Sequence, residues 1–281
     1  MAGTVLEVKS KEVFPSIFSR HAAAYERRMD DIMSRGEARG RQRVIDLVQA
    51  RPGMRILDLA CGPGTLTGPL AAMVAPGGEV VGVDLAPGML ERAQARRIPN
   101  ARFEVMDIEH LSFPDGSFDA AACGHGLQFV PDLDRALVEA RRVLRPGSRF
   151  AASVPLGGRR QEAWELLEKS AATWLPAPPP RPSDNKPTQA ALGDVDAFGA
   201  AARSAGFARA DVEVVEEKVV WASAQQLVDL ATSWWDFAAR LEGVDDSRRD
   251  GFRRDAVAML RQRYPGAIET ASQNHVLIAI A

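Results

Sequence analysis

The fold of this chain is decided by the stretch Ile56-Leu57-Asp58-Leu59-Ala60-Cys61-Gly62-Pro63-Gly64-Thr65, where an apolar run carrying one acid leads into a turn with two glycines. A short apolar run bounded by turn residues is typical of a buried strand in a parallel sheet. The glycines allow the following backbone to approach a ligand that any Cβ would exclude. The stretch therefore predicts a strand, a turn and a helix that hold a nucleotide-like cofactor.

Two cofactors remain open on this stretch alone, because NAD-binding proteins use a GxGxxG turn in the same strand-turn-helix setting. Asp58 favours S-adenosylmethionine, since it lies inside the strand, where a dinucleotide-binding loop is normally apolar. Its carboxylate can orient the ammonium of a methionyl group. Thr67 favours the same cofactor because it occupies the third glycine position. The prediction is an S-adenosylmethionine site, with an NAD oxidoreductase as an alternative that titration with both cofactors would decide.

Composition narrows the class of partner. The 281 residues are 46% hydrophobic, and 35 Lys and Arg stand against 37 Asp and Glu, for a net charge of −2. This balance disfavours nucleic acid or an anionic membrane as the main partner and favours a small-molecule substrate. The apolar stretches are strand-sized, so neither membrane insertion nor a secretory signal is expected. Cys61 and Cys123 lack CxxC spacing and indicate reduced thiols in a cytoplasmic protein, and a homodimer is allowed.

No metal is expected, because the histidines show no HExxH or other ligand spacing. They are His21, His110, His125 and His275.

Helices and strands are expected to alternate from about residue 54 to residue 155. Apolar and turn patterns predict helices at 12–31 and 37–50 and then strands at 54–60, 79–84, 101–106, 118–123 and 148–154, with helices at 65–73, 86–95 and 133–144. Strands separated by helix-length segments require right-handed parallel crossovers. The predicted fold is α/β, a doubly wound Rossmann-like sheet whose ligand lies beyond the carboxyl ends of the strands.

The second half of the chain is less regular. Helices are expected at 161–174, 195–205, 225–241 and 250–264, strands within 212–221 and at 276–281, and a loop at the proline run 176–180. The sheet then has seven strands. Three parts are predicted: an N-terminal helical lid at 1–50, a cofactor-binding core at 51–155, and helical cap insertions with the last strands at 156–281. All the tryptophans follow residue 160, and we expect some of them on the inner face of the cap.

Two further strand ends supply candidate cofactor contacts. Asp84 ends the second strand about 20 residues after Gly64, where an acid accepts the ribose hydroxyls. Asp107 ends the third strand and can accept the adenine amine, while Ile108 packs near the ring. The remaining candidates around the nucleoside are Leu85 and Met89.

Three blocks in order resemble the ubiquinone and menaquinone biosynthesis C-methyltransferases, a small-molecule branch of the class I S-adenosylmethionine methyltransferases. Residues 25–36 (YERRMDDIMSRG) are similar to their YD-x-MND-x-MS-x-G helix, residues 111–119 (LSFPDGSFD) to LPFPDxxFD, and residues 144–147 (LRPG) to LKPGG. The resemblance covers about 18–155. It implies that Tyr25 comes near the cofactor and that the backbone carbonyl of Cys123 meets the methionyl amine. The loop residues that it implies as contacts are Asp58, Ala60, Gly62 and Gly64.

The resemblance weakens at two places that face the acceptor. The family pattern FGLRN is HGLQF here, so Gln128 stands where the family has arginine, and no quinone-enzyme pattern follows residue 155. A general base helps when the acceptor is a phenol, an acidic carbon or a protonated amine. His125 beyond the fourth strand is the first candidate, His21 on the Tyr25 helix is the second, and Gln128 can orient the substrate. A polar loop residue without a catalytic role is the competing interpretation for His125.

The leading hypothesis is methyl transfer to an O, N or C atom of a small organic metabolite, such as an aromatic or polyketide-like secondary metabolite. An alternative keeps the fold and the cofactor but catalyses a cyclisation or rearrangement without methyl transfer, and a third is ligand binding without catalysis. Release of S-adenosylhomocysteine separates them. Nucleic-acid methylation is disfavoured by the charge balance and by the lack of an NPPY-type tetrad.

Overall fold

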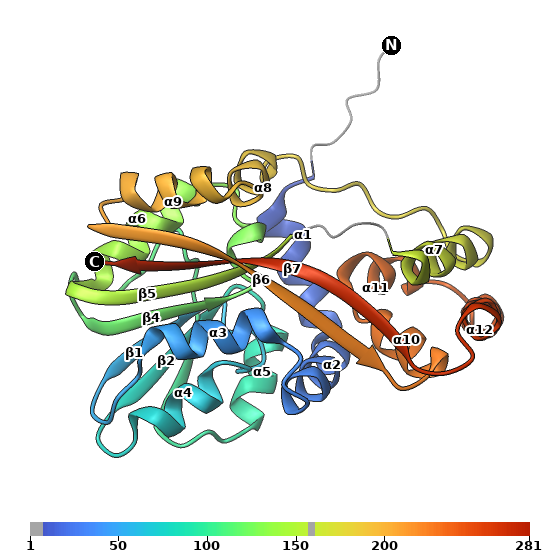
Figure 1. Ribbon diagram of the computed structural model, residues 1–281, viewed down its shortest axis with the longest axis horizontal. Helices are drawn as coiled ribbons and strands as arrows, with labels where there is room; N and C mark the ends of the chain where they lie inside the picture. The colour runs from blue at the N-terminus through green and yellow to red at the C-terminus, as the bar shows by residue number, and fades with distance from the viewer. Residues whose placement is uncertain (1–7, 157–160) are drawn as a thin grey trace, which may run out of the picture.

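Seven strands form one mixed sheet in the order β3-β2-β1-β4-β5-β7-β6 (Figure 1). The computed structural model describes residues 8–156 and 161–281. The strands are β1 (Arg55–Leu59), β2 (Glu79–Asp84), β3 (Ala101–Val105), β4 (Phe118–Gly124), β5 (Leu144–Leu156), β6 (Arg209–Trp221) and β7 (Ile268–Ile280). The first five are parallel, and β7 runs antiparallel to both β5 and β6. The predicted α/β, doubly wound seven-stranded sheet is confirmed.

Alternate residues of the central strands pack into the apolar cores on the two opposite faces of the sheet. In β4, Ala120 and Ala122 pack with the helices α3 (Arg39–Val48) and α4 (Thr67–Val74). Ala121 and Cys123 point to the other face, which α6 (Leu133–Val143) and α9 (Val195–Ser204) cover. This period of two, with both sides apolar, is what a parallel strand between two helical layers requires.

The N-terminal helix expected at 12–31 is two helices, α1 (Ser10–Arg20) and α2 (Ala22–Ser34). The backbone leaves the helical region at His21, with φ −109° and ψ 13°. The buried Glu26 holds α2 against α5 (Pro87–Ala95) through an ion pair with Arg92. By contrast, α3 packs on β4 and β5. Within the predicted lid, α3 therefore belongs to the helical layer of the sheet, whereas α1 and α2 pack against α5.

A second apolar core lies beyond the sheet, where β6 and β7 extend past β5 (Figure 1). It includes Val219, Trp221 and Ile268 from the extended strands and Met29 from α2. We call the helices around it the cap: α7 (Glu162–Trp174), α10 (Ala224–Ala231), α11 (Trp235–Leu241) and α12 (Asp246–Arg263).

The cap contains a helix break that the sequence did not predict. The single helix expected at 225–241 is α10 and α11, because Trp234 adopts an extended backbone, with φ −66° and ψ 140°. Two short elements were not predicted, η1 (Leu127–Phe129) and α8 (Lys186–Leu192), which follows the proline-rich segment. Within the described residues, none of the helices has the length and apolar character needed to cross a membrane.

Truncating the sheet core should destabilise the protein far more than truncating its edge. Phe150 of β5 is fully buried and stacks on Phe207, with ring centroids 5.7 Å apart. We expect Phe150→Ala to lower the free energy of unfolding by about 3 to 5 kcal/mol, since the cavity adds to the lost transfer free energy. Val105 on the edge strand β3 is 60% exposed, so Val105→Ala is the control and should change stability by about 0.5 kcal/mol or less. Urea denaturation measures both, and equal losses would contradict this view of the core.

Candidate active site

A cavity of about 110 Å³, here the edge cavity, lies at the carboxyl ends of β1, β2 and β4. Most of the residues predicted to bind the cofactor line it, namely Tyr25, Asp58, Ala60, Gly62, Asp84, Leu85, Met89, Asp107 and Ile108. The two that do not line it are Gly64 and Cys123. Burial raises the pKa of the Cys123 thiol to about 12, so this group is inert at neutral pH. The next residue, Gly124, lines the cavity in its place.

The two glycines of the turn serve different purposes. Both adopt left-handed backbone conformations, with φ 55° at Gly62 and 81° at Gly64. A Cβ on Gly62 would meet no atom within 4 Å, so its backbone borders open space. A Cβ on Gly64 would lie 3.4 Å from Ile98 and 3.6 Å from Ala93, so Gly64 packs against the helix layer instead. Gly62 is therefore the position where a ligand can approach the backbone.

Asp58 carries an unused acceptor at the end of β1. It is 1% exposed, and the Thr67 hydroxyl donates to its Oδ2 at 2.6 Å, while Oδ1 has no hydrogen-bond partner among the described residues. Burial raises its pKa to about 7, assisted by the charge of Asp84 and opposed by the Thr67 hydrogen bond. A buried acceptor without a partner is unfavourable. An ammonium group at Oδ1 would satisfy it, so the site fits the methionyl amine of S-adenosylmethionine.

Asp84 joins two loops at the end of β2. Its Oδ2 accepts a hydrogen bond from Gly62 N and its Oδ1 accepts one from Ala86 N, both at 2.8 Å. Burial raises its pKa and these backbone donors lower it, with a net rise. Each carboxylate oxygen has a second lone pair, so both remain able to accept from a ligand hydroxyl. This geometry fits a ribose.

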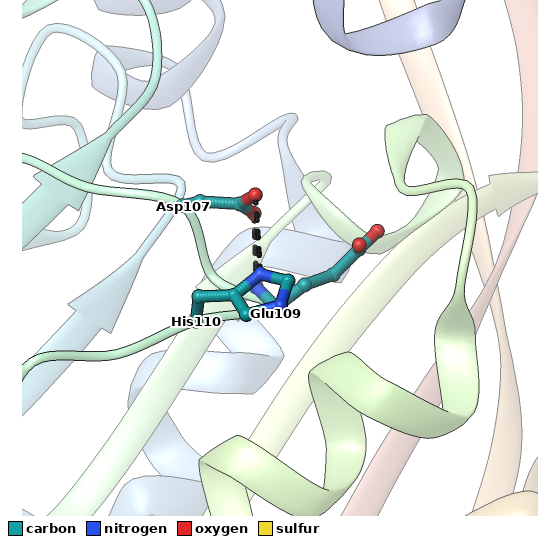
Figure 2. Close-up of side chains that lie close together, drawn as sticks. All are labelled: Asp107, Glu109 and His110. Carbon is teal, nitrogen blue, oxygen red and sulfur yellow. Dashed lines mark hydrogen bonds and ion pairs between the residues drawn. The ribbon is translucent and has the colours of Figure 1, made fainter.

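Asp107 forms an ion pair with the N-terminal helix. Lys11 of α1 donates to Asp107 Oδ2 at 2.7 Å and also contacts Glu109. Burial would raise the pKa of Asp107, but the bonds from Lys11 and from Glu109 N lower it overall. Asp107, Glu109 and His110 are the described residues that could hold a metal ion, with ligand atoms within 4.8 Å of one another (Figure 2). The Lys11 ammonium already pairs with both carboxylates and offsets one of their two negative charges.

Arg41 of α3 was not predicted from the sequence. It is 5% exposed, lines the edge cavity and donates from Nη2 to the Tyr25 hydroxyl at 3.0 Å. A guanidinium in the same cavity as Asp58 suits the carboxylate of a methionyl group, just as Asp58 suits its amine. Helical spacing could have revealed this residue, because Arg41, Val44 and Val48 lie on one face of α3 and all are buried.

A larger cavity of about 690 Å³, here the cap cavity, lies between the sheet edge and the cap. It shares six lining residues with the edge cavity: Phe14, Phe18, Tyr25, Arg41, His125 and Phe129. The prediction that tryptophans face the inside of the cap is confirmed for Trp164, Trp221, Trp234 and Trp235. Trp174 instead packs against Gly251, where a Cβ would lie 2.3 Å from its ring.

The structure separates the three catalytic candidates. His125 lines both cavities, and its Nε2 is buried without a hydrogen-bond partner among the described residues. Burial, followed by the charge of Arg41, lowers its pKa well below the usual range, so the imidazole is neutral at neutral pH. Gln128 lines the cap cavity, with Nε2 donating to the His125 carbonyl at 2.9 Å and Oε1 free to accept.

His21 lines neither cavity. It lies at the break between α1 and α2 and contacts Glu242 Oε1 at 2.8 Å. The expectation that it shares a helix and a face with Tyr25 does not hold, because the chain changes direction at this residue.

This fold and site define a class I S-adenosylmethionine-dependent methyltransferase. Residues 57–152 match the model of a methyltransferase domain. The chain is 34% identical over 172 residues to a ubiquinone/menaquinone biosynthesis C-methyltransferase UbiE of Teredinibacter turnerae, covering 58% of this chain and 69% of that protein. The chain belongs to the UbiE-like branch of this family, as the sequence blocks predicted.

Other similarities concern parts of the chain or the fold alone. An uncharacterized 37.1 kDa protein in transposon TN4556 of Streptomyces fradiae is 44% identical over 130 residues, or 45% of this chain. The chain spans 38% of that protein and 55 to 62% of three quinone-methylating relatives. The crystal structure of the YcgJ protein from Bacillus subtilis shares the fold, with a TM-score of 0.52 and 18% identity over 86% of this chain and 97% of that one.

Removing the Asp84 carboxylate should weaken cofactor binding. We expect Asp84→Asn to lower the affinity for S-adenosylhomocysteine by about tenfold to a hundredfold, because charge-assisted hydrogen bonds to the ribose are lost. Isothermal titration calorimetry measures this. Asp246→Asn is the control, since Asp246 lies on α12 with its side chain 91% exposed. Affinity of Asp84→Asn equal to that of the wild type would contradict the assignment.

The pKa of Asp58 also predicts a pH dependence. Below pH 7 the free protein holds a proton on Asp58, which must leave before the carboxylate can accept from an ammonium. Cofactor affinity should therefore fall as the pH is lowered from about 7 to about 5, by up to about tenfold per pH unit. Asp58→Asn keeps an acceptor for Thr67 and should bind more weakly at pH 7, with a flatter profile. Asp84 is present in both proteins, so identical pH profiles would exclude Asp58 as the source.

Proposed function

We propose that this chain transfers the methyl group of S-adenosylmethionine to a small organic acceptor bound in the cap cavity. The observation that carries the proposal is the common wall of the two cavities, in which Tyr25, Arg41 and His125 border both. A ligand in the edge cavity thus faces a ligand in the cap cavity. The cofactor supplies a methyl group on a sulfonium, and the acceptor's electron pair forms the new bond while the sulfur keeps the pair of the broken one.

The residues of the common wall are suited to alignment and to the exclusion of water. Phe18 and Tyr25 pack edge to face with centroids 5.7 Å apart, and Phe18 packs in the same way on Phe129 at 5.2 Å. Aromatic faces also attract a cation such as a sulfonium. Alignment of two bound reactants can supply about 7 to 11 kcal/mol of the barrier reduction, so the protein needs no nucleophile of its own.

His125 is the proposed proton acceptor. Its unpaired Nε2 can take a proton in the neutral form that burial enforces. The same burial makes it a weak base, so it suits an acceptor whose proton is acidic. Gln128 Oε1 is the proposed group that orients the acceptor by a hydrogen bond.

We propose an aromatic or polyketide-like acceptor, methylated on O, N or C, because four tryptophans line the cap cavity. These tryptophans lie beyond residues 57–152, so the substrates named for the quinone-methylating relatives are not assigned to this chain. A cavity of this size fits a small molecule better than it fits nucleic acid. A cytoplasmic location is part of the proposal, since Cys61 and Cys123 are both free thiols.

Release of S-adenosylhomocysteine tests the proposal. The protein is incubated with S-adenosylmethionine and a panel of phenols, enols and aromatic acids, and the product is quantified by mass spectrometry. We expect turnover with at least one acceptor, and we expect His125→Asn to lower kcat by about a hundredfold or more. His21→Asn is the matched control and should leave kcat unchanged, because His21 lies outside both cavities.

One result would contradict this function, and another would contradict the role of His125. Tight cofactor binding with no S-adenosylhomocysteine across the panel would favour the cyclisation or rearrangement alternative. Full activity of His125→Asn would show that no proton passes through this imidazole.

A further inference from the structure

Arg28 of α2 is a buried cation without a counterion. It is 6% exposed and lines the cap cavity but not the edge cavity. Within the described residues it forms no ion pair and makes one hydrogen bond, from Nη1 to the Ser233 hydroxyl at 3.3 Å, while its Nε is buried and unpaired. A guanidinium has five N–H donors. Buried charges in proteins are normally paired, so this arrangement indicates a partner that arrives with the ligand.

The acid that attracts Arg28 electrostatically does not fill that role. Glu217 of β6 attracts Arg28, but its Oε2 accepts from Gly40 N at 3.2 Å and from Asn274 Nδ2 at 3.3 Å. Burial lowers the pKa of Arg28 only to about 10, so the guanidinium is charged at neutral pH. The neutral His125 adds no charge.

The cap cavity has other charged side chains, and each is considered in turn as a partner for an anionic acceptor. Arg41 faces both cavities and suits the methionyl carboxylate, as described above. Glu168 pairs with Arg240 at 2.8 Å, and Asp236 Oδ1 accepts from Phe237 N at 2.9 Å. Two further cations, Arg181 and Lys186, line the same cavity, and Arg181 lies 5.7 Å from the Trp235 ring centroid. Arg28 is thus the buried cation left for the acceptor.

Aromatic rings hold the Arg28 guanidinium. Its central carbon lies 4.2 Å from the ring centroid of Trp234 and 5.3 Å from that of Tyr25. Trp234 in turn meets Trp164 edge to face, with centroids 6.0 Å apart. A cation between aromatic faces keeps its in-plane N–H donors for a planar acceptor group.

We propose that Arg28 recognises a negatively charged oxygen on the acceptor, a planar carboxylate or an ionised phenol or enol, whose flat apolar body packs against Trp164 and Trp234. This inference rests on the proposed function, since it identifies the class of acceptor for the same site.

Ligand binding without turnover tests the inference. With S-adenosylhomocysteine in excess, tryptophan fluorescence measures binding of 2-naphthoate and of neutral 2-naphthamide. Binding of 2-naphthol as a function of pH tests the ionised phenol. We expect naphthoate to bind about tenfold to a hundredfold more tightly than naphthamide, and Arg28→Met to abolish this preference. Arg28→Lys should keep part of it. Arg27→Met is the matched control, because Arg27 is the neighbouring exposed arginine of the same helix.

A second readout separates recognition from a structural role. Removing an unpaired buried charge should leave the Tm of the ligand-free protein unchanged or raise it, and should leave S-adenosylhomocysteine affinity unchanged. A wild type that binds naphthoate no better than naphthamide, or binds neither, overturns the inference, as does an Arg28→Met protein that keeps the preference. An anion preference without methyl transfer would overturn the proposed function but leave this inference standing.

Discussion

The hydrogen bond from the Gly62 backbone N–H to the Asp84 carboxylate is the interaction on which the rest of the site depends. It ties the turn after β1 to the end of β2, and the second carboxylate oxygen holds Ala86 at the start of α5. Burial of this acid is unfavourable, and its raised pKa reflects that. The two backbone donors offset part of the penalty. A ligand that donates hydroxyl groups to the remaining lone pairs would offset more of it.

The cap supplies what the parallel sheet cannot. Parallel strands end together at one edge and therefore gather polar groups there, but they provide no walls above that edge. The helices α1 and α2 and the cap line a second cavity that shares Tyr25, Arg41 and His125 with the first. The common wall places a neutral imidazole beside two buried arginines. These charges lower the pKa of His125 further, so the same groups that attract an anion also weaken the base.

The sheet and the cofactor loops could be predicted because they depend on local signals. The bounds of β2 agree with the predicted 79–84, and the acids expected at the cofactor line the edge cavity because parallel strands with short loops deliver their ends to the same place. The two helix breaks were not predicted, for a different reason. The breaks at His21 and Trp234 carry no proline or glycine, so no local residue announces them. The segments on each side of these breaks pack against the cap. Residues distant in sequence therefore determine where the helices end.

By itself, the sequence determined the α/β class, the seven strands, the cofactor and the acids that line the edge cavity, because periodicity and strand-end residues are local properties. Only the tertiary structure showed that Arg28 and Arg41 line the cap cavity together with His125 and Gln128. Arg27 and Arg28 are adjacent and chemically identical, yet Arg27 is exposed while Arg28 is 6% exposed beneath Trp234. The reason is that burial of a helical residue depends on the element that packs over it, and here that element begins more than 200 residues further along the chain.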